Sequence, residues 1–301
     1  MNLTGFGWAV VVLAMGQATA VENPLLDELL QQGVLMSDGS RIKLPPPTLG
    51  DGLDAAGQRA VLDRLLAATK HKYEDLVRRD YQAAFVLDIR AVRTSQVDSP
   101  ARRIDLWFVA HGDFKMATSE KFLEGLWRSA AKPDPSDPLA ARSVTLTPAD
   151  LAKRQVRLDA PPGVDERFVF GTVNLFDRVL VSATQRGMLT RRPQTVVVAE
   201  MIDARFTKDA EYPNQWQSAT IGGDGKVALG EPQPYAAAGS YGKATSLANP
   251  PGALLFEFHL VYEEPRRWFG GANLMGSKLP LAVQDQVRNF RRRLAKASSG
   301  R

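Results

Sequence analysis

The sequence has three histidines and no cysteine, and two of the histidines lie near carboxylates in a way that could support acid–base chemistry. The missing cysteine excludes disulfides, thiolate zinc sites and cysteine nucleophiles. His111 ends an alternating stretch in which Asp105 lies on the same face, and Asp113 follows two residues later. An imidazole beside a carboxylate can act as a general base. One hypothesis is therefore a hydrolase that uses His111 with Asp105 or Asp113, and the alternative is a solvent-exposed histidine at a strand end.

A second histidine lies among acidic residues. His259 shares one face of a predicted strand with Glu257 and Glu263, because alternate residues of a strand point to the same side. Imidazole and carboxylate groups can bind a metal or form a proton relay. The same pattern is expected for the polar outer face of a half-exposed strand, so both interpretations stay open. His71 lies between two lysines and is expected at the surface.

The common catalytic motifs are absent from the sequence. It has neither the Gly-x-Ser-x-Gly turn of serine hydrolases nor the His-Glu-x-x-His motif of zinc proteases. Residues 239–245 come close to a phosphate-binding loop, but the segment is too short and lies in a strand context. The sequence therefore predicts no metal site and no cofactor, and it favours a binding or structural protein over an enzyme.

Large aromatic side chains are the candidates for a ligand site: Trp107, Trp216, Tyr241 and Trp268. They fall on predicted strand faces or in turns. Aromatic residues with a polar edge are frequent in pockets and interfaces, and most ligand pockets are largely apolar. If these residues line a pocket, its ligand is a small apolar molecule; packing in the core is the alternative.

The elements that would position these residues are mostly strands. Residues 82–93 and 103–111 alternate apolar and polar side chains, and the polar connection between them predicts an antiparallel pair. Helices are predicted at 54–70 and 118–129, and strands dominate residues 168–262.

The chain ends in a predicted amphipathic helix. Val283, Val287, Phe290 and Leu294 recur at helical spacing, and Pro280 is expected in the first turn, where proline is tolerated. The fold class that follows is α+β: a curved, mostly antiparallel sheet with early helices, on which the long C-terminal helix packs.

This order of elements resembles the helix-grip architecture, in which a curved sheet wraps a C-terminal helix. The resemblance covers the element order and the closing segment, residues 268–294. It implies that the space between sheet and helix holds an apolar ligand. The expected function is an exported, non-enzymatic protein that either binds a small apolar molecule there or has a structural role in the cell envelope.

Composition divides the chain into five segments. A signal segment is followed by an N-terminal part with helices and the first strand pair, a proline-rich connector, a strand-rich part closed by the last helix, and a short tail. Their bounds are 1–20, 21–130, 131–147, 148–297 and 298–301.

The positive charge is local. Residues 287–301 contain six basic residues and no acid, and removing these six charges from the net +5 leaves −1 for the rest of the chain. A nucleic-acid-binding surface over the body is therefore not expected. A further alternative is a docking module that holds an anionic envelope surface with basic residues of the last helix, namely Arg288, Arg291, Arg292 and Arg293.

The N-terminus predicts export. Residues 6–15 form an uncharged apolar run, and Ala18-Thr19-Ala20 has the small-x-small pattern of a signal-peptide cleavage site. The run is shorter than the ~20 residues that span a bilayer. No other stretch is apolar enough for a transmembrane helix.

We expect the exported protein to begin at Val21, because cleavage follows the small residue at position 20. N-terminal sequencing of the protein purified from its native source tests this. Recovery of the chain from the cytosolic fraction with Met1 in place would contradict it.

Overall fold

The computed structural model describes most of the chain after the predicted signal segment. The described residues are 22–92, 100–119, 122, 137–223, 226–265, 268–269 and 274–299. Residues 1–20 and nearly all of the helix predicted at 118–129 lie outside them. No helix within these ranges is long and apolar enough to cross a membrane.

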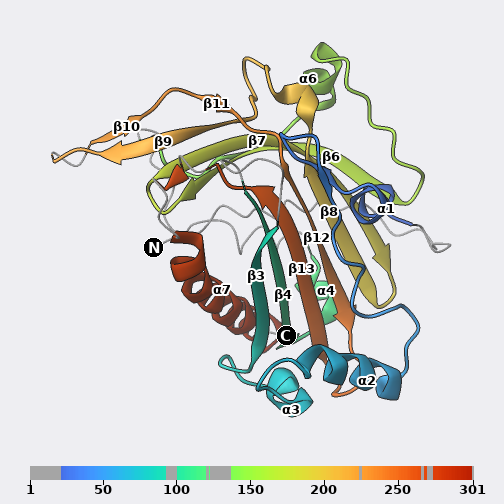
Figure 1. Ribbon diagram of the computed structural model, residues 1–301. Coiled ribbons are helices and arrows are strands. Elements are labelled where there is room, and N and C mark those ends of the chain that lie inside the picture. Colours follow the sequence, from blue (N-terminus) through green and yellow to red (C-terminus); the bar gives the residue numbers. More distant parts are fainter. Residues whose placement is uncertain are drawn as a thin grey trace.

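Among the described residues, eleven strands form one antiparallel sheet that is not closed (Figure 1). The main path runs in the order β10 (Val227–Leu229), β9 (Gln215–Ile221), β7 (Val179–Arg192), β8 (Thr195–Ile202), β12 (Ala238–Ser246), β13 (Ala253–Glu263), β4 (Ala101–His111) and β3 (Phe85–Val92). Off this path are β6 (Val164–Leu175) on β7, β5 (Ser143–Thr145) on β6, and β11 (Gln233–Pro234) on β9. The predicted α+β class with a large antiparallel sheet is confirmed.

The strand pairing joins parts of the chain that lie far apart in sequence. β4 pairs along its whole length with β13, from Ala101 opposite Glu263 to His111 opposite Ala253. The strand pair predicted near residues 82–111 is thus continuous with the strand-rich part that follows the predicted connector.

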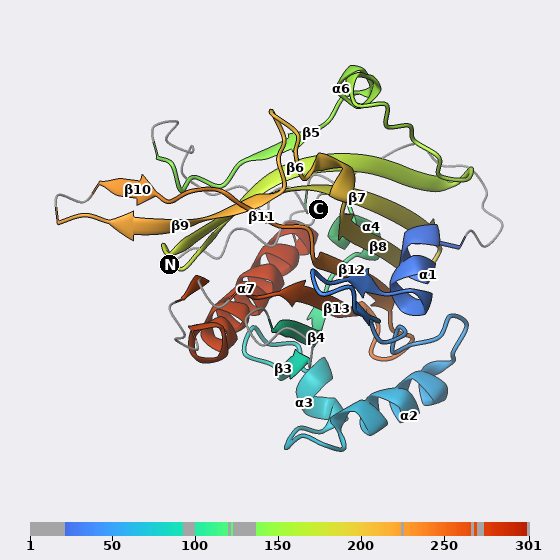
Figure 2. The same ribbon diagram turned by 45° about the horizontal axis from the view of Figure 1, so that its top comes forward.

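The two faces of the sheet are covered by different parts of the chain. Helix α7 (Leu274–Ser299) lies on the inner side of the curve, and α1 (Pro24–Gln31) lies on the opposite, outer side (Figure 2). In the central strands, alternate residues therefore face α7 or the N-terminal segment. On β13, for example, Leu254 packs with α7, whereas Val261 packs with α1.

The N-terminal segment begins with a capped helix. Asn23 accepts a hydrogen bond from the backbone N–H of Leu26, and Pro24 takes the first helical position, where its missing N–H costs nothing. Gly33 ends the helix with a φ of 76° and leads into the hairpin of β1 (Val34–Leu35) and β2 (Arg41–Ile42).

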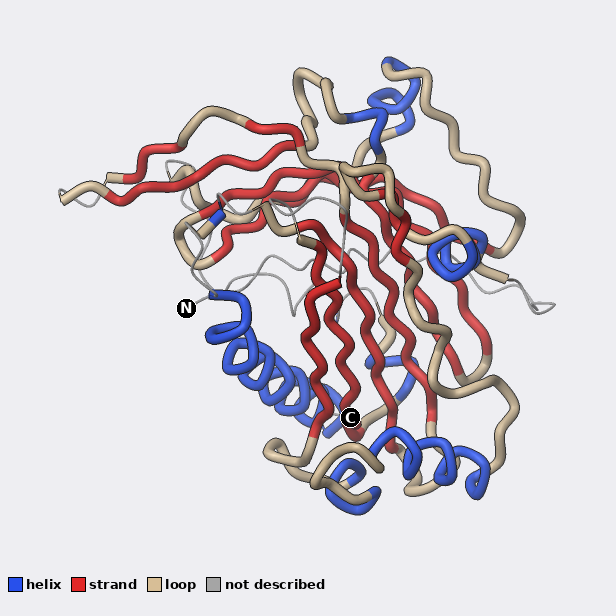
Figure 3. The backbone as a smooth tube through the Cα atoms, viewed as in Figure 1, coloured by secondary structure: helices blue, strands red, loops and turns tan. Residues whose placement is uncertain are grey.

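A loop connects this hairpin to two further helices. Residues 45–51, which we call the strap, run along the outer face before α2 (Ala55–Leu66) and α3 (Tyr73–Val77) cover one end of the strands (Figure 3). Leu62 and Leu76 are fully buried with Leu255 of β13. Burial of these side chains fixes α2 and α3 on the sheet.

Helix α7 begins earlier than expected. Pro280 was predicted in its first turn, but it lies inside the helix, which starts at Leu274. The added N-terminal turns bury Met275 and Leu279 against the sheet, and this burial offsets the hydrogen bond that a proline inside a helix removes. At the other end, the helix packs closely against Gly112, which has no side chain; a Cβ there would lie 2.7 Å from Leu294 Cγ.

The basic residues of α7 do not form one surface. Arg292 and Arg293 are exposed and Arg288 is partly exposed, but Arg291 is 5 % exposed. Arg291 was predicted among the surface-binding residues, and this placement is wrong. It lies four residues after Val287 and three before Leu294, which puts it on the buried stripe.

The Arg291 guanidinium is held by backbone carbonyls. It donates to the carbonyls of Val109 (2.8 Å), Ala83 (2.6 Å), Ala84 (2.8 Å) and Tyr81 (3.3 Å). Burial lowers the pKa of Arg291 to about 10. Beside it, the ring of Phe290 packs edge-to-face against that of Phe256, with 4.6 Å between the ring centroids. Arg291 thus ties α7 to β4 and to the start of β3.

Replacing Arg291 with methionine should lower the free energy of unfolding by about 2–4 kcal/mol, because buried carbonyls would lose a charged donor. Arg292→Met is the matched control. Arg292 is exposed and its guanidinium lies over the ring of Tyr81, so its loss should cost less than about 1 kcal/mol. Urea denaturation of both variants decides between the two roles. Equal losses would contradict a structural role specific to Arg291.

Candidate functional site

The outer face of the sheet carries ionisable side chains at its centre. Asp105 on β4 lies opposite His259 on β13, and Glu257 on β13 lies opposite Lys243 on β12. Directly opposed residues share a face of the sheet, so these four side chains form a continuous row. All four are buried: Asp105 and His259 are 0 % exposed, Glu257 is 2 % exposed and Lys243 is 6 % exposed. We call them the charged row.

His259 connects the two carboxylates of the row. Its Nδ1 lies 2.7 Å from Asp105 Oδ1, and its Nε2 lies 3.5 Å from Glu257 Oε2. The imidazole ring stacks on Tyr241 at 4.7 Å between centroids and meets Trp107 edge-on at 5.1 Å. Aromatic rings thus close the space around the imidazole.

The ionisation of the row follows from these contacts. Burial alone would lower the pKa of His259, but the hydrogen bonds and charges of Asp105 and Glu257 outweigh it and raise the pKa. Burial raises the pKa of Asp105, yet its hydrogen bonds with His259 and Arg103 lower it further than that. The protonated imidazolium form of His259 is therefore favoured, and its Nδ1–H donates a hydrogen bond to Asp105.

The strap covers the row and forms hydrogen bonds with it and with the aromatic residues beside it. Prolines 45–47 have no backbone N–H, so Thr48 is the first residue after them that can donate one. The Thr48 N–H donates to Glu257 Oε2 at 2.7 Å, and the Trp107 indole N–H donates to Thr48 Oγ1 at 2.7 Å. Two strap carbonyls accept hydrogen bonds as well. The carbonyl of Pro45 accepts one from the Tyr241 hydroxyl (2.8 Å), and the carbonyl of Leu49 accepts one from Lys243 Nζ (2.7 Å).

This arrangement holds a proton without offering it to a substrate. An acid–base residue must come within hydrogen-bond reach of the reacting group, and the imidazole of His259 is fully covered. What the row does is to pair charges and to anchor the strap. The interpretation of His259 as part of the polar outer face of a half-exposed strand is wrong, because the N-terminal segment buries this face around His259.

Glu263 serves a different part of the N-terminal segment. Its carboxylate accepts hydrogen bonds from the backbone N–H of Ser37, at 3.1 Å, and from the Ser37 hydroxyl. Glu263 thus holds the turn of the β1–β2 hairpin and does not join His259 and Glu257. Within the described ranges, no three histidine or carboxylate side chains are placed to hold a metal ion.

The hydrolase pairs suggested by the sequence do not form. His111 Nε2 lies 2.8 Å from the carbonyl of Val77, and Asp113 caps α4 (Phe114–Ala117) by accepting from the N–H of Met116. Asp105 instead pairs with His259. Asp105 and His111 share a strand face but are six residues apart, which at ~3.3 Å per residue separates them by about 20 Å.

The candidate ligand residues fall into two groups on opposite faces. Trp107 and Tyr241 flank the charged row on the outer face. Trp216 and Trp268 meet edge-on on the inner side, 6.3 Å apart, where they pack with Met275 and Leu279 of α7. No single pocket can use all four.

Two tyrosines complete the inner group. Tyr235 and Tyr262 lie 5.4 and 6.3 Å from the Trp268 ring, and all four residues are buried. We call Trp216, Tyr235, Tyr262 and Trp268 the aromatic cluster. Tyr235 donates its hydroxyl to the carbonyl of Glu263 at 3.0 Å. The Tyr262 hydroxyl and the Trp268 indole N–H are buried without a hydrogen-bond partner among the described residues.

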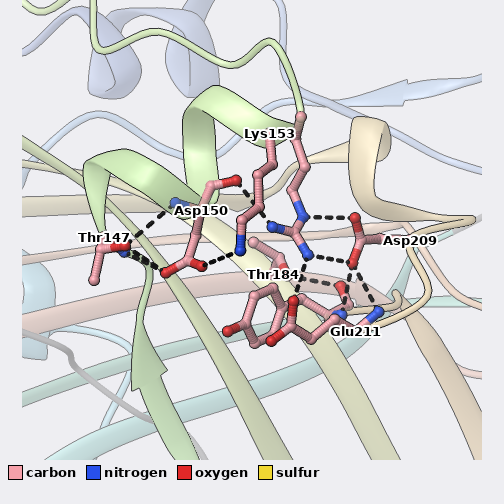
Figure 4. Close-up of polar contacts among 8 residues, drawn as sticks. Thr147, Asp150, Lys153, Thr184, Asp209 and Glu211 are labelled. Atoms are coloured by element: carbon pink, nitrogen blue, oxygen red, sulfur yellow. Dashed lines mark hydrogen bonds and ion pairs between the residues drawn. The ribbon is translucent and has the colours of Figure 1, made fainter.

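Another polar group lies near the periphery and is structural (Figure 4). Arg154, just after α6 (Pro148–Lys153), forms two hydrogen bonds with Asp209, at 2.6 and 3.0 Å, and one with Glu211 at 3.0 Å. The hydrogen bond with Arg154 lowers the pKa of Asp209 to about 2. Thr147 and Asp150 form a reciprocal cap on α6. These groups satisfy one another and fasten α6 to the loop after η1 (Ala204–Phe206).

Sequence reasoning missed two participants in the outer site, Lys243 and Thr48. Lys243 lies on the same face of β12 as Tyr241, which is the one signal in the sequence that could have pointed to it. Its importance depends on the pairing of β12 with β13, which a single sequence does not specify. Thr48 carries no local signal beyond its position after three prolines.

Comparison with known proteins adds no assignment: no protein-family model matches the chain, and no curated protein resembles it significantly.

The stability of the protein should fall as the pH rises through the folded-state pKa of His259. That pKa is raised above the unfolded value of ~6.5, so the stabilisation is complete below this value and is lost above the folded pKa. His259→Gln should remove this loss. Thermal melts between about pH 5 and 9 measure it.

His111→Gln provides a control of opposite sign. Burial lowers the pKa of His111, so its contribution to stability is present at high pH and is lost as the pH falls. This variant should keep the high-pH loss seen in the wild type. If His259→Gln keeps that loss, the charged row is not its source.

Proposed function

We propose that this chain is an exported, non-enzymatic binding protein that holds a small, largely apolar ligand between the sheet and α7. The observation that carries the proposal is the aromatic cluster at the start of α7, where two buried polar atoms have no partner among the described residues. The cluster is apolar with few oriented polar groups, which is the usual make-up of the residues that line small-molecule sites.

The chemistry of the two polar atoms defines the ligand further. The Trp268 indole N–H can only donate, and the Tyr262 hydroxyl donates or accepts. Burial raises the pKa of Tyr262, so the phenol keeps its proton. A ligand with an apolar body and one acceptor oxygen, such as a carbonyl or ether, would satisfy both donors.

The cost of leaving these groups unpaired supports a ligand at this place. An unsatisfied buried donor costs about 1–3 kcal/mol, whereas an apolar group of the same shape would cost nothing. Phenylalanine would fill the ring position of Tyr262 without that cost. A retained cost at two neighbouring positions is typical of a site that binds something.

The burial of the charged row supports a non-enzymatic function. Its imidazole is closed beneath the strap, and His111 is bonded to a backbone carbonyl. Neither histidine is positioned beside the aromatic cluster, because both lie on the outer strand face. A ligand there would be bound without either of these histidines beside it.

We expect the protein purified under native conditions to carry a small molecule, detected as a mass difference between native and denaturing mass spectra. Trp268→Phe and Tyr262→Phe should each reduce its occupancy severalfold, since one lost hydrogen bond corresponds to ~1 kcal/mol. Tyr262→Phe should be at least as stable as the wild type, because it removes an unpaired buried hydroxyl at nearly unchanged volume, whereas Trp268→Phe also leaves a cavity and should lose some stability.

Trp107→Phe is the matched control, because Trp107 is an indole on the outer face. Its ligand occupancy should equal that of the wild type. The proposal fails if the wild type carries no small molecule, or if occupancy is unchanged in both cluster variants.

A further inference from the structure

A cavity of about 130 Å³ lies on the outer face, next to the charged row. It is enclosed by the start of α1, the strap and the β7–β8 hairpin, and its lining residues are Asn23, Leu26, Pro47, Asp51, Thr190, Arg192, Thr195, Val197 and Lys243. Nothing in the proposed binding of an apolar ligand involves this cavity, since the aromatic cluster lies on the inner face.

The charged groups of the cavity are two cations and one anion. Lys243 Nζ lies 2.9 Å from Asp51 Oδ1, and Arg192 forms an ion pair with the other carboxylate oxygen of Asp51. Asp51 lies in the strap and is 36 % exposed at its side chain, whereas Lys243 is 6 % exposed. The charges of the lining residues themselves therefore sum to +1.

Lys243 also retains a donor. An ammonium group has three N–H bonds. The carbonyl of Leu49 and the carboxylate of Asp51 accept two of them, and the third has no partner among the described residues. A buried ammonium with an unused N–H favours an anionic acceptor, because charge-assisted hydrogen bonds are about twice as strong as neutral ones.

Hydroxyl and apolar groups surround this ammonium. Thr190 and Thr195 contribute buried side chains to the lining. Thr245 lies opposite Thr195 on the same face, and its buried hydroxyl has no hydrogen-bond partner in the described part of the chain. Leu26 and Val197 give the lining an apolar side.

The size of the cavity limits the ligand. A cavity of about 150 Å³ can hold a benzene molecule, so this one has room for roughly five or six non-hydrogen atoms. One end of such a molecule would meet Lys243 and Arg192, and the rest would contact Leu26 and Val197. This combination is matched by an anion with a short apolar chain.

We propose that this cavity is a binding site for a short-chain carboxylate, whose carboxylate group shares Lys243 and Arg192 with Asp51. Asp51 is then an internal competitor: it holds the two cations when the ligand is absent, and it weakens the ligand's attraction to them. Binding of the carboxylate loosens the contact between Asp51 and the sheet.

Propionate is the probe, and propionamide is its neutral counterpart of the same shape. Isothermal titration or ligand-observed NMR with the full mature chain should detect propionate with a Kd on the order of 1 mM, and no binding of propionamide in the same range. Arg192→Gln should weaken propionate binding about tenfold, because it removes one of the two cations. Asp51→Asn should strengthen binding by a similar factor, because it removes the competing carboxylate.

Arg205→Gln and Asp203→Asn are the matched controls. Arg205 and Asp203 form a hydrogen-bonded ion pair outside the cavity, with distances of 2.9 and 2.5 Å. Both control variants should bind propionate like the wild type. The gain expected for Asp51→Asn separates a ligand site from a structural ion pair, because loss of a structural pair alone would not improve binding.

The proposal is overturned if propionate binds neither to the wild type nor to the Asp51→Asn variant. It is also overturned if propionamide binds as tightly as propionate, because the charge would then contribute nothing. These outcomes are independent of the proposed apolar ligand, which Trp268→Phe and Tyr262→Phe test on the other face of the sheet.

Discussion

The fold depends on the burial of four ionisable side chains in the middle of a sheet. Removing charges from water costs several kcal/mol for each ion unless they are paired and hydrogen-bonded. The register of β4, β13 and β12 brings Asp105, His259, Glu257 and Lys243 together as alternating charges. This pairing supplies part of the compensation, and the remaining polar atoms need partners from outside the sheet.

The strap supplies these partners, and its sequence suits the task. Three prolines restrict it to an extended path and remove its N–H groups, so that its carbonyls accept from Tyr241 and Lys243 while the first free N–H reaches Glu257. The N-terminal segment is therefore held over the sheet by specific polar contacts as well as by the apolar residues of α1 and α2. One buried atom, Glu257 Oε1, has no partner among the described residues.

The inner face is organised by a different principle. There α7 packs apolar residues against β4 and β13, and its one buried charge, on Arg291, is spread over the backbone carbonyls of Val109, Ala83 and Ala84. At the start of the helix the aromatic cluster leaves Tyr262 and Trp268 with unpaired polar atoms. On the outer face, Glu257 Oε1, the Thr245 hydroxyl and one N–H of Lys243 have no partner among the described residues. On the inner face, the same is true of the Tyr262 hydroxyl and the Trp268 indole N–H.

The sequence alone determined the α+β class, the antiparallel sheet and the amphipathic C-terminal helix, because strand alternation and helical spacing are local properties of the chain. It also placed His259 and Glu257 on one strand face for the same reason. The partner of His259 could not be read locally, since Asp105 lies 154 positions away and only the pairing of β4 with β13 brings them together. The burial of Arg291 was likewise decided by the tertiary structure. Helical spacing puts position 291 on the stripe that faces the sheet, but only the packed fold brings backbone carbonyls from β4 and from the residues before β3 within reach of its guanidinium.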